Sequence, residues 1–317
     1  MGITAKSARE SARDYGIVLA FLALFAILSF STNTFLTQQN LVNIFDQIAV
    51  LGIFACAIAL AMISGVFDLS VTAIAALSAI VGIHVMNASG LLPGVLAAVL
   101  LGVALGAING LAVTYGKVHS FIATLASSMV FRGIAIVVTG GQIVAAEDPA
   151  LGQLSAASPL FNITWASWMF LAVAIVMGLV VWKTVYGRSV YAVGGNPASA
   201  RLSGISVGKV QTSAFMISGG LSALAGMILA SRSFSAQPNM GSGLELTAIA
   251  AVVIGGVALT GGVGAIWRAV LGVLLLQLIG NGFNLLGLPS SFQQVVQGAL
   301  ILFAVALDQR IRKQQKT

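Results

Sequence analysis

Residues that could carry out covalent or metal chemistry are few in this sequence and far apart. The chain has two histidines, His84 and His119, and one cysteine, Cys56, which lies inside an apolar run. No HExxH, paired-cysteine or GxxxxGK[ST] pattern occurs, so the motifs of a metal site and of a P-loop ATPase are absent. Neither histidine has a serine or cysteine partner at a known catalytic spacing. We therefore expect no catalytic residue, no metal and no cofactor on this chain.

Three ionisable residues stand within or at the edge of apolar segments, where a charge is costly and usually functional. Asp68 and Glu245 each open an apolar run, and Arg132 lies deep in another. An acid in the first turn of a helix is favoured by the helix dipole, so both acids have a structural alternative to gating or docking. Arg132 is expected to face a transport pathway or to pair with Glu147 or Asp148.

Neutral amide side chains are the other polar groups of the apolar segments. Such amides can exchange hydrogen bonds with an uncharged polyol without trapping it, and the alternative is that they join one helix to another. Some recur three residues apart, on one helical face. The candidates for a polyol pathway are Asn109, Asn281, Asn284 and Gln294.

These groups must be positioned by helices that cross a membrane. Of the 317 residues, 58% are hydrophobic and 7% are charged, whereas soluble domains carry about 25% charged residues. A span needs about 20 mostly apolar residues. We predict an all-α membrane protein in which residues 1–317 form one transmembrane domain. Its ten predicted spans lie at 15–31, 41–63, 68–86, 91–115, 119–139, 165–183, 210–230, 244–260, 263–283 and 291–307.

The basic residues indicate the orientation of these spans. With the N-terminus in the cytoplasm, thirteen of the 15 Lys and Arg residues fall on the inner side, and Arg132 and Arg232 are the exceptions. The loop at 140–164 has no Lys or Arg, as expected on the periplasmic side. Both termini are therefore predicted to be cytoplasmic. Ten spans divide five and five about this loop, which is compatible with an inverted repeat.

The longest inner connection, residues 184–209, is predicted to contain a short helix outside the membrane. Asn196 suits the N-cap and Pro197 the first helical position. Gly204 can take the left-handed conformation that ends a helix. The segment is either a plain connector or a coupling helix that docks to a partner. The residues predicted for that contact are Gly195, Asn196, Ala200, Arg201 and Gly204.

Five stretches in order along the chain carry longer motifs. They are SGVFDLSV (64–71), HSFIATLASSMVFRGIA (119–135), YAVGGNPASARLSGI (191–205), VVIGGVALTGGVGAI (252–266) and GNGFNLLGLPSSFQQVVQGALIL (280–302). The third is similar to a loop AIGGNxxAARLSGI, with Pro197 and Ala198 where acidic residues are frequent. Together the stretches resemble the permease subunits of bacterial ABC importers for monosaccharides of the ribose, arabinose and xylose type.

This resemblance implies an inner-membrane permease that works as a dimer with cytoplasmic ATPase subunits and a periplasmic sugar-binding protein. A homodimer is favoured over a heterodimer, and ATP is expected to be used by the partner subunit. The resemblance also implies that Phe67 and Asp68 form a gating or structural turn in the interior. Arg132 is a third candidate for a gating or structural role.

Three other functions stay open. A secondary transporter would need carboxylates in mid-span, and few are present. A permease for branched-chain amino acids belongs to a related class, but the GGN-type loop and the FDLS turn favour a sugar permease. The third alternative is a membrane enzyme or receptor, and no set of catalytic residues in the sequence supports it. The sugar itself is not identified by the sequence.

Overall fold

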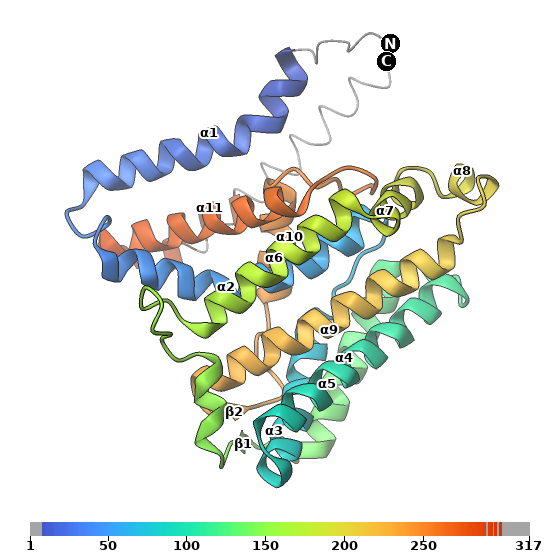
Figure 1. Ribbon diagram of the computed structural model, residues 1–317, viewed down its shortest axis with the longest axis horizontal. Helices are drawn as coiled ribbons and strands as arrows, with labels where there is room; N and C mark the ends of the chain where they lie inside the picture. Colours follow the sequence, from blue (N-terminus) through green and yellow to red (C-terminus); the bar gives the residue numbers. More distant parts are fainter. Residues whose placement is uncertain (1–7, 290, 294, 297, 300–317) are drawn as a thin grey trace.

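The computed structural model describes residues 8–289, 291–293, 295–296 and 298–299, and helices dominate this part of the chain (Figure 1). The α-helices are α1 Ala8–Ser31, α2 Gln38–Ile63, α3 Val71–Ser89, α4 Leu91–Thr114, α5 Ser120–Thr139, α6 Trp165–Lys183, α7 Val185–Gly195, α8 Pro197–Leu202, α9 Val207–Ser233, α10 Leu244–Ile254 and α11 Ile266–Leu285. The short 3-10 helix η1 spans Pro149–Leu154, and strand β1 (Val144–Ala145) pairs antiparallel with β2 (Ser235–Ala236).

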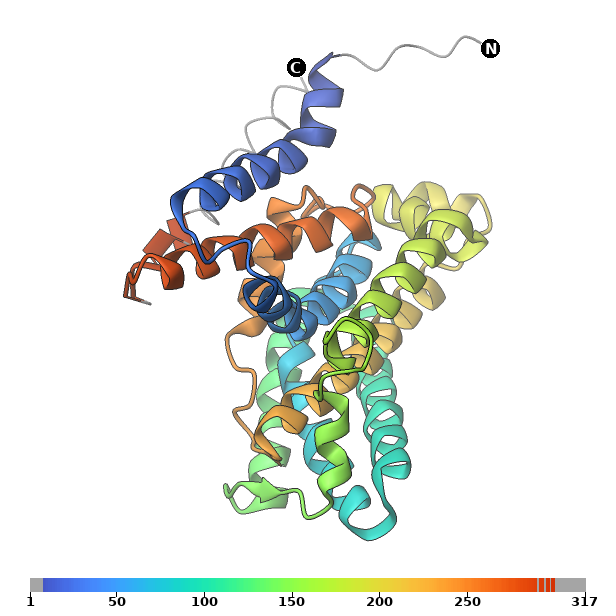
Figure 2. The same ribbon diagram turned by 60° about the vertical axis from the view of Figure 1, so that its left-hand side comes forward.

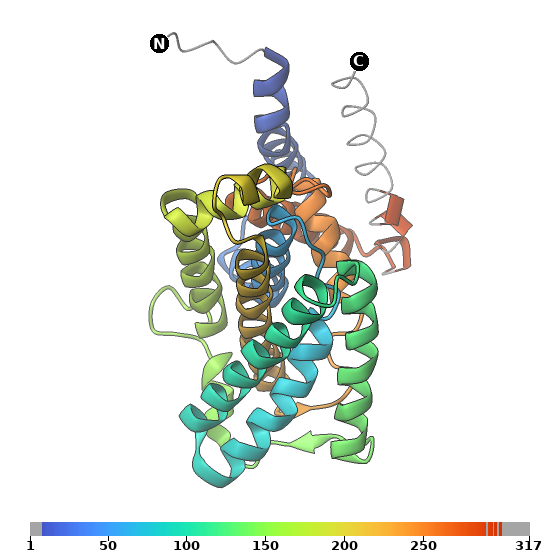
Figure 3. The same ribbon diagram turned by 90° about the vertical axis from the view of Figure 1, so that its right-hand side faces the viewer.

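The connections between the long helices gather at two opposite ends of the bundle. Helices α7 and α8 and the turn from α4 to α5 lie at one end, whereas β1, β2 and the turn from α3 to α4 lie at the other (Figures 1 and 3). Helix α1 packs beside α11, at the edge of the bundle away from α4 (Figure 2). The basic connection at 184–209 and the loop at 140–164 are thus separated by the length of the bundle.

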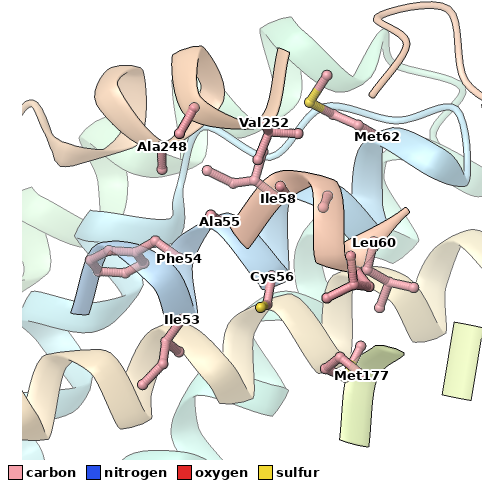
Figure 4. Close-up of a cluster of buried hydrophobic side chains, with 14 of the residues drawn as sticks. Ile53, Phe54, Ala55, Cys56, Ile58, Leu60, Met62, Met177, Ala248 and Val252 are labelled. Carbon is pink, nitrogen blue, oxygen red and sulfur yellow. The ribbon is translucent and has the colours of Figure 1, made fainter. Parts of the chain in front are cut away.

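Helix α2 runs through the middle of the molecule. From Ile48 to Ile63 every residue is buried, as expected for a helix that is apolar on all sides. Its side chains meet Ala248 and Val252 of α10 on one side and Met177 of α6 on another (Figure 4). Helices α3 and α9 share this interior position. The segment that joins α2 to α3 therefore lies next to the central helices.

Helices α4 and α9 approach each other closely because glycine lines their contact. A Cβ added at Gly102 would lie 2.4 Å from the carbonyl oxygen of Gly219, and one added at Gly106 would lie 2.2 Å from that of Phe215. Small residues allow this backbone contact between membrane helices. By contrast, α5 exposes large apolar side chains, among them Ile122 and Val137. The exposed apolar surface is typical of a protein that faces lipid or a membrane partner.

Seven of the described helices are long and apolar enough to cross a membrane, namely α2, α3, α4, α5, α6, α9 and α11. The predicted spans at 41–63, 91–115, 119–139 and 165–183 coincide with four of them. The span predicted at 244–260 is wrong as one continuous helix. Helix α10 ends at Ile254 because Gly255 and Gly256 follow, and Gly256 has a left-handed φ of 81°.

Two further predicted spans are not settled. The apolar part of α1, Gly16–Ser31, is shorter than a full span. The span predicted at 291–307 lies mostly outside the described residues. A multi-pass helical membrane protein is therefore confirmed, whereas ten spans and an inverted repeat stay predictions.

Candidate functional site

The segment between α2 and α3, residues 64–70, is not helical, although it lies within the bundle. Backbone groups of an interrupted span need protein partners because lipid offers none. Phe67 N donates to Ser120 Oγ at 3.0 Å, and Leu69 N donates to Thr124 Oγ1 at 3.1 Å. Phe67 and Leu69 are two residues apart, which is about 6.6 Å in an extended chain. Ser120 and Thr124 are four residues apart, which is about 6 Å along a helix. Two hydroxyls on one face of α5 therefore match alternate N–H groups of the segment.

Asp68 is the polar centre of this segment, and it is only 1% exposed. Its carboxylate accepts hydrogen bonds from the Ser70 N–H at 3.0 Å, the Ser70 hydroxyl at 2.5 Å and the Ser218 hydroxyl at 2.7 Å. Asn109 donates to the same Ser70 hydroxyl at 2.7 Å. One carboxylate thus joins the start of α3 to α9 directly and to α4 through Ser70.

Arg132 belongs to a second polar network, which meets the first turn of α3 at Thr72. Its guanidinium donates to Thr72 Oγ1 at 3.0 Å, and the Thr72 hydroxyl donates to Glu245 Oε2 at 2.8 Å. This chain of two hydrogen bonds connects α5, α3 and α10. Among the described contacts Arg132 pairs with neither Glu147 nor Asp148, because Thr72 lies within reach in the bundle interior. Glu245 is therefore connected to Arg132, the one arginine of α5, through the Thr72 hydroxyl.

Backbone segments from three parts of the chain meet at the end of the bundle that carries α7 and α8. Gly262 N donates to the carbonyl oxygen of Ile63, the last residue of α2, at 2.9 Å. A Cβ added at Gly194 would lie 1.9 Å from that same oxygen, and one added at Gly262 would lie 2.4 Å from the Cα of Gly195. We call this set the glycine junction; its members are Gly65, Gly194, Gly195, Gly261 and Gly262.

A tyrosine of α7 reinforces the glycine junction. The Tyr191 hydroxyl donates to the carbonyl oxygen of Gly264 at 2.8 Å. Burial raises the pKa of Tyr191, and the charge of Arg268 offsets part of that rise. The hydroxyl therefore stays protonated at neutral pH and keeps its donor. Helix α7 is thus tied to the connection between α10 and α11.

Helix α8 has the capped form expected from the sequence. Asn196 Oδ1 accepts from Ser199 N at 3.0 Å, and Gly204 has a φ of 82°. Ala200 is buried and anchors the helix, whereas Arg201 and Leu202 are exposed, Leu202 to 90%. A buried anchor with an exposed basic and apolar tip is a form suited to docking.

Helix α7 was not expected from the sequence. Gly194 and Gly195 form the last residues of this 11-residue helix. Glycine is permitted there because other backbones approach it in the glycine junction, a contact that no local pattern reveals. Gly195 therefore has a structural contact besides its predicted coupling role.

The amides predicted for the pathway are dispersed. Asn281 of α11 and Asn40 of α2 donate to each other's side-chain oxygens at 2.7 and 3.2 Å, so they join two helices. Asn109 joins α4 to the Asp68 network, and Asn284 is exposed. Gln294 lies outside the described residues. A pathway role for these four residues stays a prediction.

A pocket that the sequence did not reveal opens between α2, α10 and α11. Its volume is about 260 Å³, and the Gln277 amide donates to the Gln47 side-chain oxygen in its wall. The lining residues are Gln47, Leu51, Leu244, Thr247, Leu276, Gln277 and Gln293. We call it the glutamine pocket. Its polar members come from three separate parts of the chain, so no spacing in the sequence marks them.

The similar proteins are all described as permease components of transport systems. The sequence profile of the family described as "Branched-chain amino acid transport system / permease component" matches residues 40–305. The ribose import permease protein RbsC of Escherichia coli (strain K12) is 40% identical over 302 residues, which cover 92% of each chain. RbsC of Bacillus subtilis (strain 168) is 41% identical over 300 residues, 93% of this chain and 92% of the relative.

An arabinose relative extends the comparison. The L-arabinose ABC transporter permease protein AraH of Azospirillum brasilense is 35% identical over 302 residues, which cover 95% of this chain and 89% of the relative. No solved structure matches the chain significantly.

Proposed function

This chain belongs to the family of branched-chain amino acid transport system permease components, and from this premise we propose that it is the membrane-spanning permease of an ATP-driven monosaccharide importer. The observation that carries the substrate class is the identity of 35% to 41%, over most of the chain, to ribose and arabinose import permeases. The family description names branched-chain amino acids, whereas these relatives are named for ribose and arabinose. Sugar is therefore favoured over branched-chain amino acids.

The work of transport is divided among subunits in this proposal. A permease of an ABC importer acts with an ATPase subunit and a substrate-binding protein. Since this sequence has no P-loop motif, ATP is used by the partner and this chain needs no cofactor of its own. A second copy of the chain completes the pathway as a homodimer in the inner membrane. Both termini face the cytoplasm, in accord with the distribution of basic residues.

Helix α8 is the proposed contact with the ATPase. A helix of six residues is too short to be stable alone, so it must be held by the permease, by the partner or by both. Here Ala200 anchors it, and the neighbouring glycine junction connects α7 to the end of α2 and to the connection that precedes α11. A displacement of α8 by the ATPase is thereby transmitted to the segment 64–70 and to the connection between α10 and α11, which supports an alternating-access mechanism.

The test is sugar uptake by proteoliposomes that contain the permease, its ATPase and its binding protein. Uptake of labelled ribose or arabinose should require ATP inside and binding protein outside. Arg201→Glu should lower uptake and substrate-stimulated ATP hydrolysis together by about tenfold, since about 1.4 kcal/mol of lost contact is a factor of ten. The level of inserted permease should not change, because Arg201 lies outside the spans.

The matched control is Arg188→Glu, which makes the same charge change on the exposed surface of α7. Equal losses in both variants would mean that general surface charge, not α8, governs the effect. Uptake without ATP would instead indicate a secondary transporter and would overturn the proposed function.

A further inference from the structure

Two glutamines meet in the wall of the glutamine pocket, on helices that are long enough to cross a membrane. Gln47 belongs to α2 and Gln277 to α11, and a hydrogen bond joins their side chains. At 1.5 Å per residue they lie about 12–14 Å from the ends of their helices, at the end of the bundle opposite α8. They are therefore placed within the span and not at its rim.

An amide in this position cannot face lipid without cost. Gln47 is exposed and Gln277 half-buried, and among the described residues the bond between them is the one hydrogen bond that either amide makes. Transfer of an unpaired amide from water to an apolar medium costs about 2–7 kcal/mol. Lipid-exposed polar groups are accordingly rare in membrane spans. The face with Gln47 and Gln277 must therefore adjoin water, a ligand or protein.

The other residues that line the pocket indicate which chemical class of ligand it would bind. Thr247 and Gln293 add a hydroxyl and an amide, and the remaining residues, Leu51, Leu244 and Leu276, are apolar. None of the described residues that line the pocket is charged. A zwitterionic amino acid would find no counter-charge there, whereas a sugar offers hydroxyls to the amides and a C–H face to the leucines. The lining thus discriminates between the two substrate classes of the family.

The position of Gln293 depends on a glycine. A Cβ added at Gly280 of α11 would lie 2.5 Å from Gln293 Nε2. The missing side chain at Gly280 makes room for this amide against the helix, beside Gln277. The pocket wall is therefore shaped to hold its amides, and a single methyl group is enough to displace one of them.

The wall supplied by α10 is connected to the rest of the bundle. Leu244 and Thr247 flank Glu245, which accepts the hydrogen bond from Thr72. Residues with left-handed φ precede and follow this helix, namely Gly243 at 91° and Gly256 at 81°. Movement of α10 would change the pocket and the Thr72 contact together.

We propose that the glutamine pocket is a sugar-binding subsite of the transport pathway, in which Gln47, Gln277, Thr247 and Gln293 bond to hydroxyls of a monosaccharide. The inference rests on the proposed function and deepens it. It assigns substrate contacts to residues whose amides are spread over α2, α11 and the segment after α11. It also places the pathway along the face formed by α2, α10 and α11.

The experiment measures ATP-driven uptake in proteoliposomes with saturating, sugar-loaded binding protein. Gln277→Leu and Gln47→Leu remove the amides at similar size and favour insertion into lipid. Each should lower sugar uptake about tenfold while ATP hydrolysis continues, so that more ATP is used per sugar transported. Gly280→Ala retains every polar residue of the pocket and should also lower uptake, because it displaces Gln293.

The matched control is Gln39→Leu, an exposed glutamine at the start of α2 outside the pocket. It should transport at the wild-type rate. Wild-type rates in Gln277→Leu, Gln47→Leu and Gly280→Ala would overturn the subsite while sugar uptake by the wild type upholds the proposed function. Failure of the wild type to transport any monosaccharide that its binding protein carries would count against the proposed function itself.

A third outcome would also overturn the subsite. If the leucine variants convert the permease from dimer to monomer, as measured by light scattering in detergent, the glutamines hold two copies together. Retention of the dimer together with lost uptake is the result expected for a subsite.

Discussion

At the scale of single residues, Asp68 shows how a charge is accommodated inside the bundle. Its carboxylate accepts three hydrogen bonds from two serines and is almost fully buried. Hydrogen bonds to a charged group contribute about 1.5–3 kcal/mol each. The residue therefore holds the interrupted segment against α9 with several contacts at once. Removal of its charge should weaken these contacts without removing the acceptor at Oδ1.

Asp68→Asn tests whether the charge itself is needed. The amide oxygen can still accept from Ser70, and the amide nitrogen can donate to the Ser218 hydroxyl, so insertion and assembly should be retained. We expect uptake to fall by about tenfold or more, since the loss of one charge-assisted hydrogen bond at 1.5 kcal/mol already corresponds to a factor of ten. Uptake normalised to the amount of permease in the membrane measures this effect.

The comparison variant is Asp68→Ala, which leaves the donors of Ser70 and Ser218 without an acceptor. It should lower the amount of folded permease as well as uptake. Normal uptake in Asp68→Asn would return Asp68 to a purely structural role at the start of α3.

At the scale of elements, the glycine junction links the coupling region, α7 and α8, to the segment 64–70 and to the connection between α10 and α11. It forms where α7 ends, where α2 ends and where the chain returns between α10 and α11. The carbonyl oxygen of Ile63 accepts from Gly262 N at 2.9 Å, and it lies where a Gly194 side chain would be. Contacts between backbones leave no room for adjustment by rotamer changes. The junction should therefore transmit motion with little loss.

Gly194→Ala should disrupt this transmission. Its Cβ would lie 1.9 Å from the Ile63 oxygen, so α7 must move away from α2. We expect a loss of about 1–3 kcal/mol in stability, typical of overpacking, and a larger relative loss of sugar uptake than of thermal stability in detergent. ATP hydrolysis should no longer respond to loaded binding protein.

The control for this variant is Gly178→Ala on α6, where an added Cβ meets nothing within 4 Å. It should leave stability and uptake unchanged or slightly raise stability, since alanine favours helix more than glycine by about 1 kcal/mol. Wild-type coupling in Gly194→Ala would mean that α8 acts on the spans by another route.

At the scale of the whole molecule, the two ends of the bundle differ in charge. The end with α7 and α8 carries basic residues of the connections, Lys117, Lys183, Arg188 and Arg201, whereas the loop at 140–164 lies at the opposite end (Figure 3). Basic residues are retained on the cytoplasmic side of membrane proteins. The arrangement in space is therefore compatible with the orientation predicted from the sequence.

Reporter fusions test this orientation. Fusions at Lys117, at Arg188 and at the C-terminus should report the cytoplasm, because the basic clusters resist translocation. A fusion at Gln153, in the loop between α5 and α6, should report the periplasm. A cytoplasmic signal at Gln153 would contradict the ten-span topology, and a periplasmic signal at the C-terminus would contradict the even number of spans.

Local signals explain what could be predicted from the sequence. Runs of apolar residues marked α2, α4, α5 and α6 closely, since hydropathy depends only on neighbours along the chain. The capped helix α8 was predicted from Asn196, Pro197 and Gly204 for the same reason: an N-cap and a left-handed terminus are contacts within a few residues. The ordered motifs were sufficient for the family, which the relatives confirm.

The tertiary structure alone decided which polar groups meet. Asp68 and Ser218 are 150 positions apart, and Gln47 and Gln277 are 230 apart. Their contacts depend on the face that each helix turns to its neighbours, and helices that are apolar all round carry no periodic signal for that face. The same limit explains why the break after α10 and the glycine junction were missed. Glycine permits both a turn and a close approach of backbones, and only the neighbours in space select between them.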